Sequence, residues 1–185
     1  MKAVVIYESM YGNTHRIASA IAEGLRSHVE AVVVPVREAQ SPLVESADVV
    51  VVGGPTHAHG MSRSATRKGA VVAAEKPGSD LVLDNDAVPD ALGLREWFAS
   101  LGRIATDAAA FDTRLNHAAA LTGRASKGIA RKLRQHGATL ISDPQSFFVT
   151  KHNDLEPNEE ARARDWGAQL GLDLARGGVS DRAKR

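Results

Sequence analysis

The sequence predicts an α/β domain with a doubly wound, five-stranded parallel sheet and helices on both faces. Short β-branched runs alternate along the chain with stretches that carry apolar residues at helical spacing. This alternation is typical of successive strand–helix–strand units. Residues 47–52, Ala-Asp-Val-Val-Val-Val, form an almost continuous apolar run. Such a run is typical of a central strand that is covered on both faces.

The strands are expected where apolar residues cluster between turn residues. Pro35 closes the second strand, and Asp143-Pro144 interrupts the fifth before it resumes. The expected ranges are 2–7, 31–34, 47–52, 108–111 and 138–141 with 147–149.

The helices are expected where apolar residues recur every third or fourth position. A short helical turn opens at Ser41-Pro42, Gly137 is expected to end one helix, and Gly177-Gly178 is expected to stop the last. The expected ranges are 13–28, 64–75, 93–101, 125–136 and 159–176.

The length of 185 residues suits a single domain, which we expect over residues 1–178. Residues 61–92 interrupt the strand–helix rhythm and are expected to form an excursion, or insertion, after the third strand. It either covers a ligand or is a surface insertion. Residues 179–185 are expected to form a disordered basic tail.

Composition excludes several classes of function. The chain has no cysteine, which excludes disulfides, thiolate metal sites, iron–sulfur clusters and a cysteine nucleophile, and fits a cytoplasmic protein. It has no apolar run long enough for a membrane span. The net charge of +1 is too small to indicate nucleic-acid binding. No Gly-x-Ser-x-Gly motif of a serine hydrolase is present.

The most informative segment lies between the first strand and the first helix. Its small, hydroxyl and amide residues predict a phosphate-binding turn, because the first N–H groups of a helix have no intrahelical acceptor and carry partial positive charge. The segment lacks the lysine of a Walker A loop and the GxGxxG of a dinucleotide fold. A neutral loop of this kind suits a phosphate monoester. The alternative is an ordinary turn with Asn13 or Thr14 as a helix cap. The residues are Ser9, Met10, Tyr11, Gly12, Asn13 and Thr14.

This segment resembles the phosphate loop of flavodoxins and related FMN proteins. The family pattern is Ser/Thr-x-Thr-Gly-Asn-Thr directly after the first strand. Ser9, Gly12, Asn13 and Thr14 match it, and Tyr11 replaces the third-position threonine. The resemblance implies bound FMN, electron transfer and the flavodoxin-like strand order 2-1-3-4-5. Ligands of such folds lie beyond the carboxyl ends of the strands, so the segments 8–14, 53–60 and 112–117 are expected to converge.

The segment after the third strand resembles the flavodoxin segment that packs along the isoalloxazine ring. His57 and His59 stand where electron-carrier flavodoxins usually place a Trp or Tyr. Two alternatives remain for this histidine pair. The two side chains could bind a metal ion together with other residues, or they could simply lie on a polar surface loop. The residues expected to contact the cofactor are Pro55, Thr56, His57, Ala58, His59 and Gly60.

The segment after the fourth strand, Asp112-Thr113-Arg114, resembles the flavodoxin-like segment that meets the pyrimidine end of the flavin. A cation at Arg114 would stabilise the anionic reduced flavin and raise its reduction potential. The alternative for Arg114 is a surface pair with Asp112.

The resemblance implies three functions. The first is an FMN protein that transfers electrons to a redox partner, either a reductase or a ferredoxin. The second is an FMN-dependent NAD(P)H:quinone-type oxidoreductase with a small quinone-like acceptor. The third is a flavodoxin-fold domain that binds flavin weakly or not at all and acts through protein interaction.

A basic cluster lies in the region expected to form the helix 125–136. It is either a solvated helix face or a docking face for an acidic partner. Its members are Arg124, Lys127, Arg131, Lys132 and Arg134.

Overall fold

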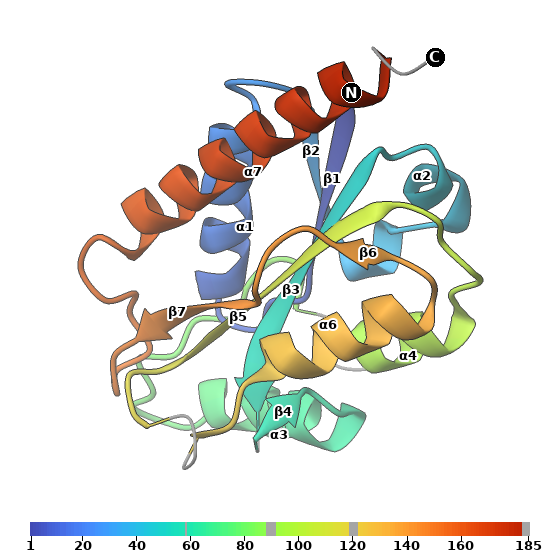
Figure 1. Cartoon of the computed structure of the whole chain (residues 1–185). Coiled ribbons are helices and arrows are strands. Elements are labelled where there is room, and N and C mark those ends of the chain that lie inside the picture. The colour runs from blue at the N-terminus through green and yellow to red at the C-terminus, as the bar shows by residue number, and fades with distance from the viewer. Residues whose placement is uncertain (58, 88–91, 119–121, 183–185) are drawn as a thin grey trace.

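The structure is a computed structural model that describes residues 1–57, 59–87, 92–118 and 122–182. A central sheet lies between two groups of helices (Figure 1). Its strands are β1 (Lys2–Tyr7), β2 (Glu30–Pro35), β3 (Val49–His57), β4 (Gly60–Met61), β5 (Asp107–Leu115), β6 (Thr139–Leu140) and β7 (Gln145–Val149).

The helices cover both faces of the sheet, and the last helix follows the last strand. They are α1 (Asn13–Leu25), α2 (Ser41–Glu45), α3 (Ser64–Ala74), α4 (Leu94–Ser100), α6 (Ala125–Gln135) and α7 (Glu159–Arg182), with a 3-10 turn η1 (Val36–Glu38). None of the helices in the described part of the chain is long and apolar enough to cross a membrane.

The strand order confirms the predicted fold class and most of the predicted order. The sheet runs β2-β1-β3-β5-β6, with β7 also on β5 and β4 on β3. The first four predicted strands, now β1, β2, β3 and β5, occur in the predicted order, and all their pairings are parallel. The prediction of five strands was wrong, because the sheet has seven strands among the described residues. The fifth predicted strand is two separate strands, and β4 forms a small antiparallel hairpin with β3.

Two predicted loops are partly strand. We expected β3 to end at 52 and β5 to end at 111, but their parallel register continues through Gly53↔Phe111 to Pro55↔Thr113. A Cβ at position 53 would lie 2.2 Å from the Phe111 ring. The glycine that indicated a turn therefore makes room for a large neighbour within the sheet.

The ends of two helices also differ from the prediction. Helix α1 ends at Leu25 rather than at 28, and α7 continues through Gly177-Gly178 to Arg182. A glycine inside a helix costs only about 1 kcal/mol relative to alanine, so the pair does not stop this helix. Residues 183–185 of the predicted tail lie outside the described residues. Gly137 follows α6 at φ +96°, which confirms it as the residue that ends this helix.

Two apolar layers lie on opposite faces of the sheet. Residues of α1 and α7 pack with one set of strand side chains, and residues of α2, α4 and α6 pack with the other. Helices α1 and α7 approach closely at Gly24 and Gly167, where a Cβ would lie 2.0 Å from the carbonyl oxygen of Arg164 and 2.1 Å from that of Ile21.

Part of the excursion, residues 84–86, contacts the end of β1 and the loop between β1 and α1, which is called the first loop below. After α3, the Asp84 N–H donates a 2.9 Å hydrogen bond to the Met10 carbonyl. The Tyr7 hydroxyl donates to the Asp86 carboxylate, and Arg37 pairs with the same carboxylate at 2.5 Å. These contacts hold residues 84–86 against the carboxyl ends of β1 and β2.

Candidate functional site

A cavity of about 250 Å³ lies at the carboxyl edge of the sheet and opens to solvent. The three segments expected to converge all contribute to its lining. The predicted site residues around it are Met10, Tyr11, Asn13, Thr14, Pro55, Thr56, His57, Thr113 and Arg114. The structure therefore brings together nine of the fifteen residues that the sequence singled out.

The loop before α1 has the backbone that an anion site requires. Gly12 precedes the helix at φ +88°, as expected for glycine in the left-handed region, and its N–H donates to Ser9 Oγ at 3.0 Å. Asn13 and Thr14 form the first positions of α1 and line the cavity. Their N–H groups lack intrahelical acceptors and lie at the positive end of the helix dipole.

The side chains of this loop have partners within the protein. Asn13 Nδ2 donates to the Asn153 carbonyl at 2.6 Å, and the hydroxyls of Thr14 and Thr113 lie 2.7 Å apart. The Tyr11 hydroxyl donates to the Ala70 carbonyl in α3 at 2.9 Å. Side-chain hydrogen bonds thus fix the shape of the loop, and the backbone N–H groups of the first helical turn remain as its main anion donors.

Asp112 stabilises the start of α6. Its carboxylate is fully buried, and its Oδ2 accepts hydrogen bonds from Thr56 Oγ1 at 2.8 Å and from the Ser126 N–H at 3.0 Å. The Thr56 hydroxyl also accepts the Ala125 N–H at 2.9 Å. Since a carboxylate that accepts first-turn N–H groups is a helix cap, the Asp112 side chain is part of the scaffold and does not line the cavity.

Arg114 lies in the wall of the cavity with only 9% of its surface exposed. Its Nη1 donates to the His117 carbonyl at 2.7 Å and to Thr122 Oγ1 at 3.1 Å, and its guanidinium lies 4.8 Å from the centre of the Phe148 ring. Burial lowers its pKa from the ordinary value. Within the described residues its hydrogen bonds go to these partners and not to Asp112, so the surface-pair alternative is wrong.

Of the two histidines at the β3–β4 hairpin, only His57 lines the cavity. His57 lines the cavity, while His59 adopts φ +71° and forms a bridge with Gly123 outside the lining. Gly60 pairs with His57 in the hairpin, and Ala58 lies outside the described residues. Burial lowers the pKa of His57, which favours its neutral imidazole. Among the described residues, no third ligating side chain joins this pair.

The cavity also contains residues that the sequence did not single out. Three of the six follow β7 and a fourth is its last residue, and the carboxyl end of β7 reaches the same edge of the sheet as β3 and β5. The rule that ligands lie beyond the strand ends was applied to three strands and would have found them if applied to the fifth. They are Leu81, Leu115, Val149, Thr150, Lys151 and Asn153.

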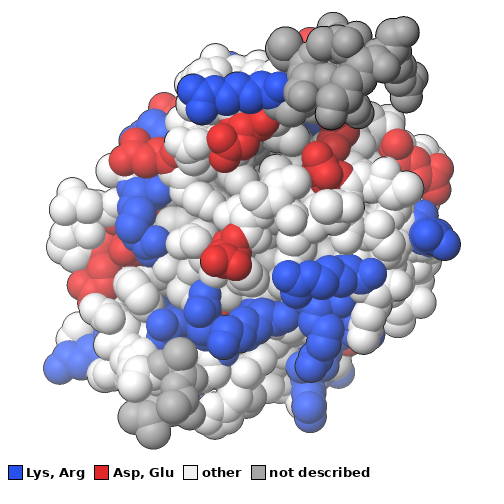
Figure 2. All heavy atoms as spheres, in the orientation of Figure 1, with Lys and Arg blue, Asp and Glu red and all other residues white. Residues whose placement is uncertain are grey.

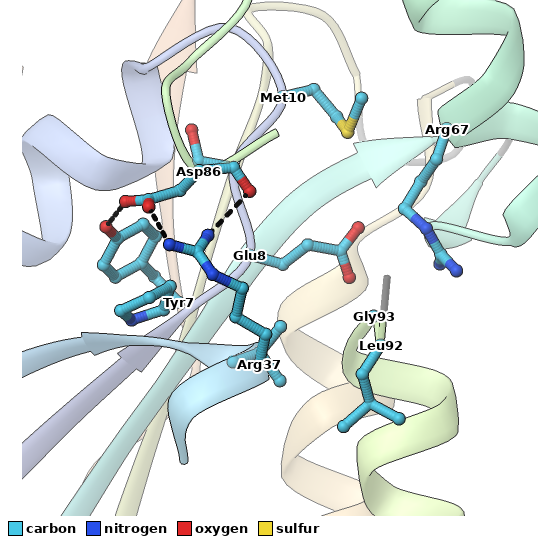
Figure 3. Close-up of a pocket in the computed structure, with 11 residues that line it drawn as sticks. Tyr7, Glu8, Met10, Arg37, Arg67, Asp86, Leu92 and Gly93 are labelled. Atoms are coloured by element: carbon cyan, nitrogen blue, oxygen red, sulfur yellow. Dashed lines mark hydrogen bonds and ion pairs between the residues drawn. The ribbon is translucent and has the colours of Figure 1, made fainter. Parts of the chain in front are cut away.

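A second, much smaller cavity of about 20 Å³ lies beside the end of β1 and the residues that follow it (Figure 3). Glu8 is buried beside it and accepts hydrogen bonds from the Ser62 hydroxyl and, at 2.8 Å, from the Leu94 N–H. Arg67 donates to Ser62 Oγ at 3.2 Å and pairs with Glu96 at 3.3 Å. This space is sufficient for about one water molecule, and the charges around it link β1 to α3 and α4.

Comparisons with known proteins agree with this architecture. Residues 4–67 match the family described as the flavodoxin domain. The structure is similar to a flavodoxin from the domain Archaea, with a TM-score of 0.63, 19% identity and coverage of 94% of this chain and 99% of that one.

Two further structures show the same fold. Oxidised Flavodoxin 1 of Bacillus cereus has a TM-score of 0.60 and 21% identity, with coverage of 91% of this chain and 95% of that one. The flavodiiron protein of Giardia intestinalis has a TM-score of 0.57 and 22% identity, with coverage of 92% of this chain and 35% of that one. A comparison with curated protein sequences finds no significant match.

Proposed function

We propose that this flavodoxin-like chain binds FMN in the cavity at the carboxyl edge of its sheet and transfers electrons to a partner protein. The observation that carries the proposal is the convergence of the first-turn N–H groups of α1 with the ends of β3, β5 and β7 around one open cavity. A phosphate monoester fits the helix terminus, and the open cavity allows a planar ring to extend toward solvent.

The charges around the cavity fit an anionic cofactor. None of its lining residues, all within the described part of the chain, is Asp or Glu, whereas Arg114 and Lys151 supply positive charge. Lys151 is exposed. It therefore supplies positive charge, which the segment 9–14 lacks, without the desolvation cost of a buried cation. The phosphate would be held at Asn13 and Thr14 by backbone N–H groups, as the dipole of α1 favours.

When bound, FMN supplies one- and two-electron chemistry, and the chain positions the cofactor and tunes its potential. Arg114 is held in place by carbonyl groups and by the Phe148 ring, so its charge has a fixed position in the cavity wall. Burial favours the neutral form of His57, whose imidazole can accept a hydrogen bond or stack without adding charge.

The partner surface that we propose is the outer face of α6. Lys127, Arg131 and Arg134 are exposed at positions i, i+4 and i+7 of this helix, and Figure 2 shows a band of Lys and Arg across the region where α6 lies in Figure 1. Like charges four residues apart destabilise a helix. No acidic residue occurs between Asp112 and Asp143. These features support an acidic docking partner such as a ferredoxin or an acidic reductase.

An electron-transfer assay tests the function. FMN-loaded protein, reduced chemically, is expected to pass electrons to an acidic ferredoxin at a rate that falls as salt rises. The double variant Lys127→Glu/Arg131→Glu should lose most of this salt dependence. Lys76→Glu, an exposed charge reversal outside α6, serves as the control. An unchanged rate and salt slope in the double variant would exclude α6 as the docking face.

The second candidate function is an FMN-dependent NAD(P)H:quinone-type oxidoreductase. The observation that favours it is His57, which stands in the sequence where electron-carrier flavodoxins usually have a Trp or Tyr stacked on the flavin ring. Because an imidazole is smaller than those side chains, it would leave more of the ring accessible to a substrate. Steady-state turnover of NAD(P)H with a quinone by the FMN-loaded protein alone would support this function over a carrier. If the protein bound no FMN at all, the third possibility, action through protein interaction, would replace both.

A further inference from the structure

We propose that His15, Asp84 and Asp86 form a binding site for a divalent metal ion of the zinc class, which joins the excursion after α3 to the first turn of α1. This site lies outside the lining of the proposed FMN cavity, and the inference does not depend on FMN binding.

The three side chains offer ligand atoms at suitable separations. One ligand atom from each lies within 4.8 Å of the others. His15 Nδ1 is 3.5 Å from Asp84 Oδ2 and 3.9 Å from Asp86 Oδ2. Two ligands of a tetrahedral zinc ion, each at about 2.1 Å, lie roughly 3.4 Å apart. The two separations from His15 Nδ1 are therefore close to those between ligands of a bound ion.

Asp84 supplies a second, independent indication. Its side chain is only 6% exposed, and its Oδ2 has no hydrogen-bond donor among the described residues. The other carboxylate oxygen, Oδ1, accepts the Asp86 N–H at 3.2 Å. A buried carboxylate oxygen without a donor is unfavourable unless a cation faces it. This oxygen faces the imidazole of His15, where a shared ion would satisfy both groups.

Neighbouring groups hold the other two ligands in place. The Tyr7 ring stacks on the His15 ring, with centroids 4.5 Å apart and an interplanar angle of 16°. The Tyr7 hydroxyl donates to Asp86 Oδ2, and Arg37 bonds to Asp86 Oδ1 at 2.5 Å, as Figure 3 shows. Such partners of the ligands fix their orientation in metal sites. The Arg37 charge offsets one carboxylate, so a net negative charge remains to attract the ion.

The donor set selects the class of ion. One imidazole nitrogen with two carboxylate oxygens suits Zn²⁺ and related transition ions, with water at the remaining position. His15 is 41% exposed, which leaves that position accessible to solvent. Mg²⁺ requires six oxygen ligands in near-octahedral geometry, so it should bind far more weakly here.

A bound ion would hold the excursion onto the first loop of the domain. The Asp84 N–H already donates to the Met10 carbonyl at 2.9 Å, and His15 directly follows Thr14 in α1. The ion would add a further connection between these segments. It would therefore stabilise the folded chain whether or not a cofactor is present.

Titration calorimetry of the metal-free full chain with Zn²⁺ tests the site. The expected result is one ion per chain, with affinity at least about tenfold lower in Asp84→Asn and in His15→Asn. Asp80→Asn, an exposed aspartate of the same excursion, and His28→Asn, an exposed histidine that follows α1, are the matched controls and should bind like the wild type. Millimolar Mg²⁺ should not compete.

Thermal unfolding with and without Zn²⁺ provides the second readout. The ion should raise the Tm of the wild type and of both controls but not that of Asp84→Asn or His15→Asn. Because His15 is partly exposed, its variant tests the site even if Asp84→Asn fails to fold. Absence of one-to-one binding by the wild type, or equal binding and equal Tm shifts in the His15 variant, would overturn the proposal. Equal competition by Mg²⁺ would overturn the assignment to the zinc class.

Discussion

The hydroxyl groups of Thr14 and Thr113 lie 2.7 Å apart, although 99 positions separate the two residues in the chain. Thr14 opens α1 and Thr113 lies near the end of β5, and both are almost fully buried. Their hydrogen bond ties the start of the first helix to the opposite side of the topological switch point between β1 and β3. This link positions the helix terminus over the cavity where we propose that FMN binds.

The first prediction concerns this link and the amide beside it. Asn13→Ala combined with Thr14→Ala should weaken FMN binding by about 1–3 kcal/mol, because hydrogen bonds that shape the anion site are lost. Fluorescence titration measures the affinity. Ser27→Ala, an exposed hydroxyl beyond the end of α1, is the control. Unchanged affinity in the double variant would argue against a phosphate at this helix terminus.

The second prediction concerns the cation in the cavity wall. Arg114→Gln should lower the reduction potential of bound FMN, because the positive charge favours the reduced, anionic cofactor. Arg124→Gln is the matched control, since that guanidinium bonds to Ser146 and to the Pro144 carbonyl and does not line the cavity. Spectroelectrochemistry reports both potentials, and a rise in the Arg114 variant would reject its proposed placement beside the ring.

The third prediction compares two glycines. Gly53→Ala should destabilise the fold by about 1–3 kcal/mol, because the new Cβ would lie 2.2 Å from the buried Phe111 ring. Gly69→Ala should stabilise it by about 0.5–1 kcal/mol, because Gly69 lies inside α3 with open space around it. Urea unfolding measures both, and a neutral effect at position 53 would contradict the observed β3–β5 register.

The fourth prediction concerns pH. Burial holds the pKa of His57 below 6.5, its ordinary value. Below that pH the unfolded chain binds a proton that the folded chain accepts less readily, so stability falls as pH drops. The loss of unfolding free energy between pH 7.5 and 5.5 should be smaller in His57→Asn than in the wild type. An equal loss in both proteins would show that His57 is not desolvated.

Much of the fold follows from local sequence patterns. The run 49–52 identifies β3 because a strand covered on both faces must be apolar on both. The turn 9–14 correctly predicted that α1 begins at residue 13. These features depend on residues close in sequence, so a single sequence contains the necessary information.

The errors have a common cause in tertiary contacts. Gly53 and Pro55 indicate a turn locally, yet the pairing with Phe111 and Thr113 keeps β3 extended. Lys151 and Asn153 directly follow the fifth predicted strand in the sequence, but it is the pairing of β7 with β5 that brings them to the cavity. Contacts of this kind depend on partners distant in the chain, which local propensity does not encode.

A fluorescence titration of the apoprotein with FMN and, in parallel, with riboflavin tests the phosphate site most directly. FMN should bind saturably at one site and riboflavin markedly more weakly, because riboflavin lacks the phosphate that the start of α1 would hold. Equal affinity for the two compounds, or no binding of either, would contradict a phosphate site at residues 9–14.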